Sequence, residues 1–248
     1  MNLVHVPKPE TQKGTPAGLV FHESLHVPWR TLHLQGHAFS AQEGVRPSDE
    51  GTRPFRPGES VRLTLGGPLF QGAIQGLPAP AEGVAWGLPE WRREAGPQGF
   101  RDVRAEEVAG YIQGAVGGKA VWGFAPTMPK RHYALPRVTA WEGILMVLQA
   151  WGFRGVVLHE LDGGILYAGP PQKSPNYGGS HRVGEEVAWV RPLGPGRYHV
   201  RMAPLPSLRV LNLLWVDHPV YRGALRVEEH RLVLTPKEAY HEVIGRAG

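Results

Sequence analysis

Apolar and polar residues alternate with a period of two over much of the chain, and glycine or proline interrupts the alternation every few residues. In residues 61–65 every second position is apolar, and a Pro-Gly pair at 57–58 and a Gly-Gly-Pro run at 66–68 bound the segment. A second predicted strand occupies residues 69–76. Because alternation bounded by glycine turns is typical of a β-hairpin, we predict one here.

A similar hairpin is predicted over residues 155–168, where Asp162-Gly163-Gly164 separates two apolar runs. An Asp-Gly pair between such runs is one of the stronger short-range signals for a hairpin. Residues 77–101 are rich in Gly and Pro and indicate a long connection. The C-terminal part offers more strand candidates, at residues 186–191, 197–202, 208–216 and 225–234.

Two helices are predicted in the middle of the chain. The first covers residues 104–116, with Asp102 as its N-cap and a Gly-Gly pair at 117–118 as its end. The second runs from Thr139 to Trp151, and Thr139 with Glu142 has the spacing of a capping box. The apolar positions that we expect on its buried face are Ile144, Leu145, Val147, Leu148 and Trp151.

Together these elements predict an α+β fold that is mainly β, in four parts. Residues 1–18 form an N-terminal arm, and residues 19–101 hold the first group of strands with the connection. Residues 102–179 form a helix-containing α+β segment that ends in the second hairpin, and residues 180–248 hold the remaining strands.

Composition narrows the function classes. Hydrophobic residues make up 42% and charged residues 20% of 248, as in an ordinary globular protein, and no apolar run is long enough for a membrane span. The first residues do not form a signal peptide. Cysteine is absent, which excludes disulfides, thiolate metal sites and a cysteine nucleophile. The 24 prolines, the preference for Arg over Lys and the lack of Cys are typical of a protein from a hot environment.

The formal charge of +5 raises the hypothesis of a β-barrel module that binds nucleic acid. However, no Lys or Arg run exceeds two residues, so charges scattered over the surface explain the balance equally well. Residues 114–120 have the wrong glycine spacing for a phosphate loop and read as the end of a helix.

A further hypothesis comes from His22-Glu23-Ser24-Leu25-His26, which has the H-E-x-x-H spacing. On a helix the two histidines would bind Zn²⁺ and Glu23 would act as general base, which describes a zinc-dependent metallopeptidase. Pro28 follows too closely for the helix to continue. We therefore interpret these histidines as residues of a strand or short turn, with no bound metal, and keep the peptidase as the alternative.

Other polar residues are candidates for acid–base pairs or for metal ligands. His33 and His37 would be additional ligands if a metal were bound near the first histidines. His159-Glu160 with Asp162, and Asp217-His218, have no second convergent group at a defined spacing. We interpret them as polar residues of turns and strands.

The order of the elements resembles the baseplate hub proteins at the tail tips of phages and related injection machines, also called late control proteins. Each motif is weak alone, but their order matches over residues 20–240. The motifs that carry the resemblance are Phe55-x-Pro57-Gly58-Glu59-x-Val61 with Phe70-x-Gly72, then Thr139-x-Trp141-Glu142 with Trp151-Gly152, and finally Gly196-x-Tyr198-x-Val200 with the strand around His230.

The resemblance implies a structural protein without enzymatic activity or cofactor. Residues 19–101 and 180–248 would each form a small tube-like β-barrel, and a homotrimer would place the barrels in a ring. The ring would join the tail tube to a spike or fibre protein, contact the tape-measure protein and let DNA pass. It would be assembled in the host cytoplasm and belong to the virion. The residues expected to maintain this architecture are Pro57, Gly58, Val61, Phe70, Gly72, Trp141, Leu145 and Leu148.

Overall fold

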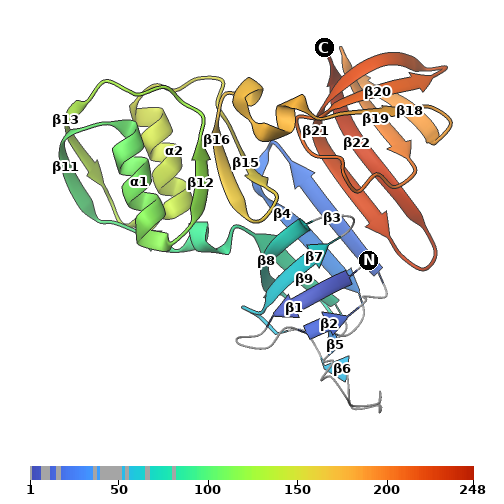
Figure 1. The fold of residues 1–248 in the computed structure, drawn as a ribbon, viewed down its shortest axis with the longest axis horizontal. Helices are drawn as coiled ribbons and strands as arrows, with labels where there is room; N and C mark the ends of the chain where they lie inside the picture. Colours follow the sequence, from blue (N-terminus) through green and yellow to red (C-terminus); the bar gives the residue numbers. More distant parts are fainter. Residues whose placement is uncertain are drawn as a thin grey trace.

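The computed structural model describes residues 2–6, 12–14, 18–35, 38–39, 52–53, 56–64, 68–79 and 82–248 (Figure 1). Phe55 of the first motif and His37 lie outside this set. The fold is α+β and mainly β, which confirms the predicted class. The described part contains the helices α1 (Ala105–Val116) and α2 (Ala140–Ala150), and neither is long and apolar enough to cross a membrane.

One thirteen-stranded sheet links the two ends of the chain. Its first half lies below and its second half at the upper right in Figure 1. The first half consists of β1 (Asn2–Val6), β2 (Gln12–Gly14), β3 (Gly18–Ser24), β4 (Val27–Gln35), β7 (Ser60–Thr64), β8 (Pro68–Gly76) and β9 (Glu82–Gly87). The second half consists of β17 (Ser180–Val183), β18 (Val187–Gly194), β19 (Arg197–Met202), β20 (Leu213–His218), β21 (Tyr221–Leu234) and β22 (Ala239–Ala247).

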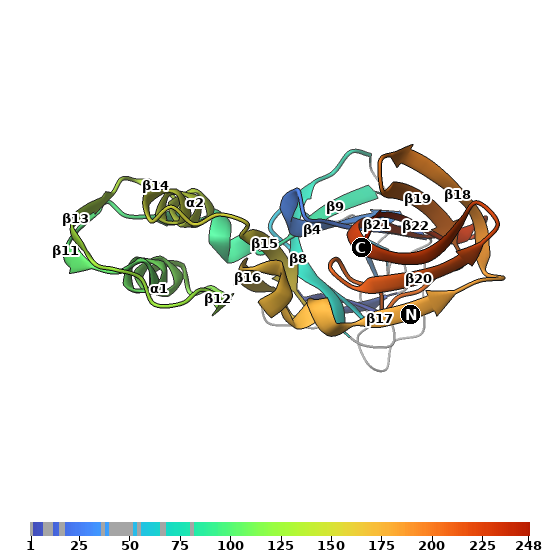
Figure 2. The same cartoon turned by 90° about the horizontal axis from the view of Figure 1, so that it is seen from above.

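Strand β21 belongs to both halves. Its beginning pairs antiparallel with β20, from Tyr221 to Arg226, and its end pairs antiparallel with β3, from Glu229 to Leu234. Each half of the sheet curls on itself (Figure 2) and encloses an apolar core of its own. The core of the first half includes Phe21 and Leu63, and the core of the second half includes Val200. The backbone pairing of the described strands leaves β2, β17 and β18 as ends, so it does not show the closed barrels that we expected.

The helices lie between two smaller sheets in the middle segment (Figures 1 and 2). These elements enclose a third apolar core, which includes Trp91, Ile112 and Ile144. The outer sheet is β11 (Gln98–Val103) with β13 (Lys130–Leu135), and the inner one is β12 (Lys119–Trp122), β16 (Ile165–Gly169) and β15 (Val157–Leu161). Short elements complete the chain: β5 (Ala38–Phe39), β6 (Thr52–Arg53), η1 (Pro89–Arg92), β10 (Glu94–Ala95), β14 (Val138–Thr139), η2 (Pro171–Lys173) and η3 (Pro175–Gly178).

The hairpins and helices predicted from short sequence motifs are present in the structure. Both predicted hairpins are present, as β7–β8 and β15–β16. The capping box of α2 is also present: the Thr139 hydroxyl accepts from Glu142 N at 3.3 Å, and Glu142 Oε2 accepts from Thr139 N at 2.9 Å. For α1 the predicted N-cap is wrong, because Arg104 occupies the N-cap position, where its N–H donates to Glu107 Oε2 at 2.7 Å, while Asp102 lies before it with φ 46°.

Two segments contain strands that the sequence did not reveal. The predicted connection 77–101 contains β9, which pairs with both β8 and β4 inside the sheet. Its buried positions are Gly83, Ala85 and Gly87, and such small residues give little apolar signal although they suit a crowded strand. In the predicted arm 1–18, β1 pairs with β7 and β2 pairs with β1.

Candidate functional site

The H-E-x-x-H segment lies on β3 and on the turn that leads to β4, not on a helix. Successive residues of a strand point to opposite faces of the sheet. The imidazole of His22 accordingly lies at the outer face, 2.9 Å from Glu229 Oε1, whereas Glu23 is buried. His26 lies in the turn. The interpretation of these histidines as strand and turn residues is confirmed, and the helical zinc site of the peptidase alternative is not formed.

Glu23 belongs to a largely buried group of charged and polar side chains that we call the ionic junction, of which Asp162 is the exposed member. Its members come from β3 and β4, from the β15–β16 hairpin, from the loop before β20, and from β21 and β22. The junction therefore connects the first half of the large sheet, the middle segment and the second half. Its members are Glu23, Arg30, Glu160, Asp162, Arg209, His230 and His241.

Arg30 is at the centre of the junction, and its side chain is fully buried. Its guanidinium donates to Glu23 Oε1 at 3.2 Å and to Asp162 Oδ1 at 2.7 Å, while its backbone N–H donates to Glu160 Oε2 at 3.0 Å. Asp162 also accepts from Arg209 Nε at 2.8 Å. Because an unpaired buried charge is very costly, the Arg30 guanidinium keeps Glu23 and Asp162, and so the segments that carry them, in contact.

The two histidines of the junction form an ordered hydrogen-bond chain. Leu205 N–H donates to His241 Nδ1 at 3.3 Å, so His241 carries its proton on Nε2 when neutral. That Nε2 lies 2.9 Å from His230 Nδ1, and His230 Nε2 lies 2.8 Å from Glu23 Oε2. Each ring therefore accepts at Nδ1 and donates at Nε2. A second proton on either ring would place two donors face to face.

The two buried carboxyl groups of the junction differ in their protonation. Burial alone would raise the pKa of Glu23, but the charge of Arg30 and then the contact with His230 outweigh burial and hold that pKa far below its usual value. Burial raises the pKa of Glu160 to about 8, against the opposing influence of Arg30. At neutral pH Glu23 is thus an anion and Glu160 a neutral acid. For His230 and His241, burial lowers the pKa, which keeps both rings neutral.

This arrangement joins parts of the fold. Glu23, Arg30 and His230 are at most 2% exposed, so a substrate cannot reach them. Their polar atoms are directed at one another. The earlier interpretation of Glu160 and Asp162 as ordinary polar residues of a hairpin is therefore incomplete, because both contact Arg30 across more than a hundred residues of sequence.

The residues predicted to maintain the first hairpin are brought together. Gly58 has φ +79° in the turn after Pro57, and its N–H donates to Ile74 O at 2.8 Å. Val61 and Phe70 are buried in the core of the first half, and Val61 pairs with Gly72. A Cβ at Gly72 would lie 2.3 Å from Trp86 O, so this strand position requires glycine.

The residues predicted on α2 divide into buried and exposed ones. Trp141 packs edge-to-face on Trp29 of β4, with ring centroids 6.1 Å apart, and Leu148 is buried in the core of the middle segment. Leu145 is 41% exposed, so its prediction as part of the buried face is wrong. The helix turns Gly143, Ile144 and Val147 inward, which leaves Leu145 on the outer side.

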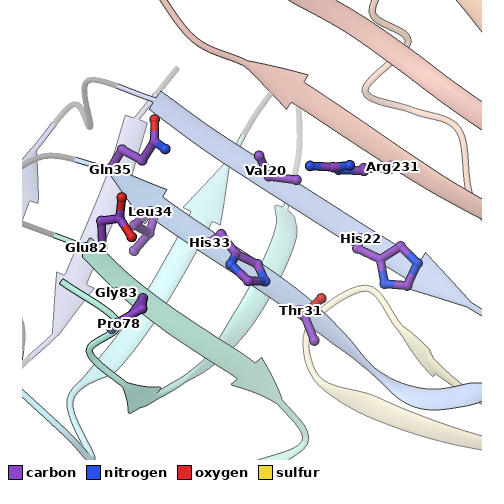
Figure 3. Close-up of a pocket in the computed structure, with 10 residues that line it drawn as sticks. All are labelled: Val20, His22, Thr31, His33, Leu34, Gln35, Pro78, Glu82, Gly83 and Arg231. Atoms are coloured by element: carbon purple, nitrogen blue, oxygen red, sulfur yellow. The ribbon is translucent and has the colours of Figure 1, made fainter.

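A pocket of about 320 Å³ opens on the outer face of the first half (Figure 3). It crosses β21, β3, β4 and β9, on the side opposite to the apolar core. Figure 3 shows His22 and His33 on the neighbouring strands β3 and β4, with Arg231 beside them on β21. Its lining residues are Val20, His22, Thr31, His33, Leu34, Gln35, Pro78, Glu82, Gly83 and Arg231.

Comparison with solved structures gives the chain the fold of phage tail proteins. The resemblance to baseplate hub proteins is thereby confirmed at the level of the fold. No family model matches the sequence, and no curated protein matches it. The likeness is therefore one of fold, at 8–10% sequence identity.

The 43 kDa tail protein of prophage MuSo2 from Shewanella oneidensis superposes with a TM-score of 0.71 at 10% identity, covering 100% of this chain and 98% of that one. A tail protein from Neisseria meningitidis gives 0.67 at 8% identity, covering 99% and 96%. A type VI secretion component of E. coli, described as similar to the T4 tail proteins gp27 and gp5, gives 0.64 at 9% identity, covering 99% and 76%. The match spans the whole chain in each case.

Proposed function

We propose that the chain is a structural component of a phage tail tip, the baseplate hub, and not an enzyme. The observation that carries the proposal is the superposition on the Shewanella tail protein over 100% of this chain and 98% of that one. Agreement over the full length includes both halves of the large sheet and the middle segment between them. Such agreement favours a shared architectural role more than the likeness of one common domain would.

In this proposal three copies associate, and the two halves of the sheet in each copy alternate around a ring. The ring would join the tail tube to a spike or fibre protein, contact the tape-measure protein and let DNA pass. The complexes of Francisella PdpA with VgrG, which superpose with a TM-score of 0.55, support a role within a larger assembly. The virion would be the final location, after assembly in the host cytoplasm.

Exposed apolar side chains support contacts with other subunits. Trp215 on β20 is 50% exposed and Val220 in the following turn 55%, while Met128 of the middle segment is 84% exposed. Large apolar and aromatic side chains at a surface are typical of interface anchors. The ionic junction supports the proposal in another way, because a hub subunit must keep its parts in fixed relative positions.

The test is the native mass in solution, measured by light scattering, together with negative-stain images. The expected result is a mass of three chains and a ring with a central hole. The variant Trp215→Glu, at an exposed strand position, shows whether β20 takes part in the contact. Gln98→Glu, at an exposed position of β11 in the middle segment, adds the same single negative charge away from β20 and is the control. A compact monomer at concentrations of tens of micromolar, with no ring in the images, would contradict the proposal.

A further inference from the structure

The outer pocket of Figure 3 holds a cationic side chain, Arg231, for which the described part of the chain provides no bonded carboxylate. Arg231 and His33 both line it, and in that part no hydrogen bond or ion pair joins either side chain to a carboxylate. His22 already donates to Glu229 at the rim, at 2.9 Å. Glu82, at the far end on β9, is the acidic residue of the lining.

The pKa of His33 depends on the charged residues around the pocket. Burial lowers the pKa of His33, and the charges of Arg231 and then His22 lower it further, while Glu82 opposes them weakly. The part of the lowering that comes from Arg231 and His22 reflects positive charge next to the His33 ring, in addition to the effect of burial. An anion placed between His33 and Arg231 would offset the repulsion and gain charge-assisted hydrogen bonds.

The remaining lining suits a short acidic side chain. Thr31 supplies a hydroxyl and Gln35 an amide, both of which can donate to an oxygen. Val20 and Pro78 give apolar walls against which the methylene groups of a glutamate could pack. The pocket therefore offers a cationic centre with neutral donors and a partly apolar edge.

We propose that this pocket binds a carboxylate side chain of a partner protein. With His33 neutral at pH 7, Arg231 is the main fixed charge at its centre, which matches a monoanion. A nucleic-acid backbone would need a track of cations, but Glu82 and Glu229 flank the pocket and would repel successive phosphates. The inference goes beyond the hub function, because the site would bind whether or not the chain forms a ring.

The test measures the pKa of His33 by NMR titration of the intact chain, alone and with three probes. The probes are a short polyglutamate peptide, inorganic phosphate and a single-stranded DNA oligonucleotide. The peptide should raise the pKa of His33 by about half a unit or more, which corresponds to about threefold in proton affinity. His199, on β19 in the other half of the sheet, is the internal reference and should not shift.

The variant Arg231→Gln separates the site from general charge attraction. It should raise the pKa of His33 in the free protein and remove the effect of the peptide. Arg62→Gln is the matched control, since Arg62 is an exposed residue on β7 of the same half and does not line the pocket. Circular dichroism checks that both variants fold. If neither variant folds, the probe titrations of the unchanged chain still decide the inference.

Three results would overturn the proposal. The first is a polyglutamate peptide that leaves the pKa of His33 unchanged. The second is equal weakening by Arg62→Gln and Arg231→Gln, which would indicate nonspecific attraction. The third is a larger shift with DNA or phosphate than with the peptide, which would assign the pocket to phosphate groups. The native-mass measurement stays separate, so a failed ring and an empty pocket are distinguishable results.

Discussion

Replacing the two buried glutamates of the ionic junction by glutamine should change stability in opposite directions. Glu23 and Glu160 are 2% and 1% exposed, and Glu→Gln keeps the volume in both cases, so packing is nearly constant. The two residues differ in charge, because Glu23 is ionised and Glu160 is protonated at neutral pH. The paired substitutions therefore isolate the electrostatic contribution.

Glu23→Gln removes the anion that accepts from Arg30 at 3.2 Å and from His230 at 2.8 Å. Breaking a buried ion pair from one side typically costs about 3–5 kcal/mol. Asp162 remains bonded to Arg30 and compensates part of the charge, so we expect the lower end, about 3 kcal/mol. This equals about a hundredfold in the unfolding equilibrium. Asp217→Asn, which breaks an exposed pair with Arg222, should cost at most about 1 kcal/mol.

Glu160→Gln should stabilise the protein at pH 7. A folded pKa of about 8 against 4.5 for the model value means that the folded state retains a proton that the unfolded chain releases. Stability from such a raised pKa is lost as pH rises, and between pH 4.5 and 7 the loss amounts to about 3 kcal/mol. Glutamine has no proton to release, so the variant should recover up to this amount. The gain should shrink toward zero as pH falls to about 4.5.

Urea unfolding followed by tryptophan fluorescence measures these differences, since the chain has 8 tryptophans. Each variant is compared with the parent at pH 7 and again near pH 5, with the denaturant slope checked for constancy. Changes in the same direction for Glu23→Gln and Glu160→Gln would refute the assignment of one anion and one neutral acid. So would a gain for Glu160→Gln that does not depend on pH.

Further measurements test other parts of the structure. Gly72→Ala should lower the free energy of unfolding by about 2 kcal/mol or more, because a backbone oxygen lies 2.3 Å from the added Cβ. Gly76→Ala, whose Cβ would meet no atom within 4 Å, should have a small effect in the same urea assay. Leu148→Ala should cost about 2–5 kcal/mol in the same assay, and Leu145→Ala less than about 1 kcal/mol, since only the former is buried; equal losses would contradict the orientation of α2. Burial lowers the pKa of each junction histidine, so below pH 6.5 the unfolded chain binds more protons than the folded one. The free energy of unfolding should therefore fall as pH drops, by up to about 1.4 kcal/mol per pH unit and histidine, with Glu160 opposing part of the change, and Tm should fall with it. A flat Tm from pH 7 to 5 would contradict neutral buried rings.

Sequence reasoning succeeded where the signal was local. The capping box at Thr139 and Glu142, and the Asp162-Gly163 turn, depend on residues a few positions apart, so their chemistry is visible in the sequence. The prediction for Leu145 failed because an apolar stretch on a helix does not show which of its residues face a neighbouring helix. That direction is set by the contact with α1, a tertiary feature.

The ionic junction could not be predicted from the sequence because its contacts are distant in the chain. Glu160 is 130 residues from Arg30, and His230 is 207 residues from Glu23. One signal was available: Arg30 occupies the same alternating register as the buried residues Leu32 and Leu34. A cation at an inward position of a strand indicates that acidic partners must meet it, although it does not identify them.

The passage of β21 through both halves of the large sheet has a mechanical consequence. Backbone hydrogen bonds run from β20 and β22 through this strand to β3, so the two halves cannot pivot about a flexible linker. A force applied to one half is transmitted to the other through the backbone hydrogen bonds of β21, which are loaded in parallel and therefore resist deformation more than a loop would. In the proposed ring, any rearrangement would then occur at the borders between neighbouring copies, with each copy moving as a rigid block.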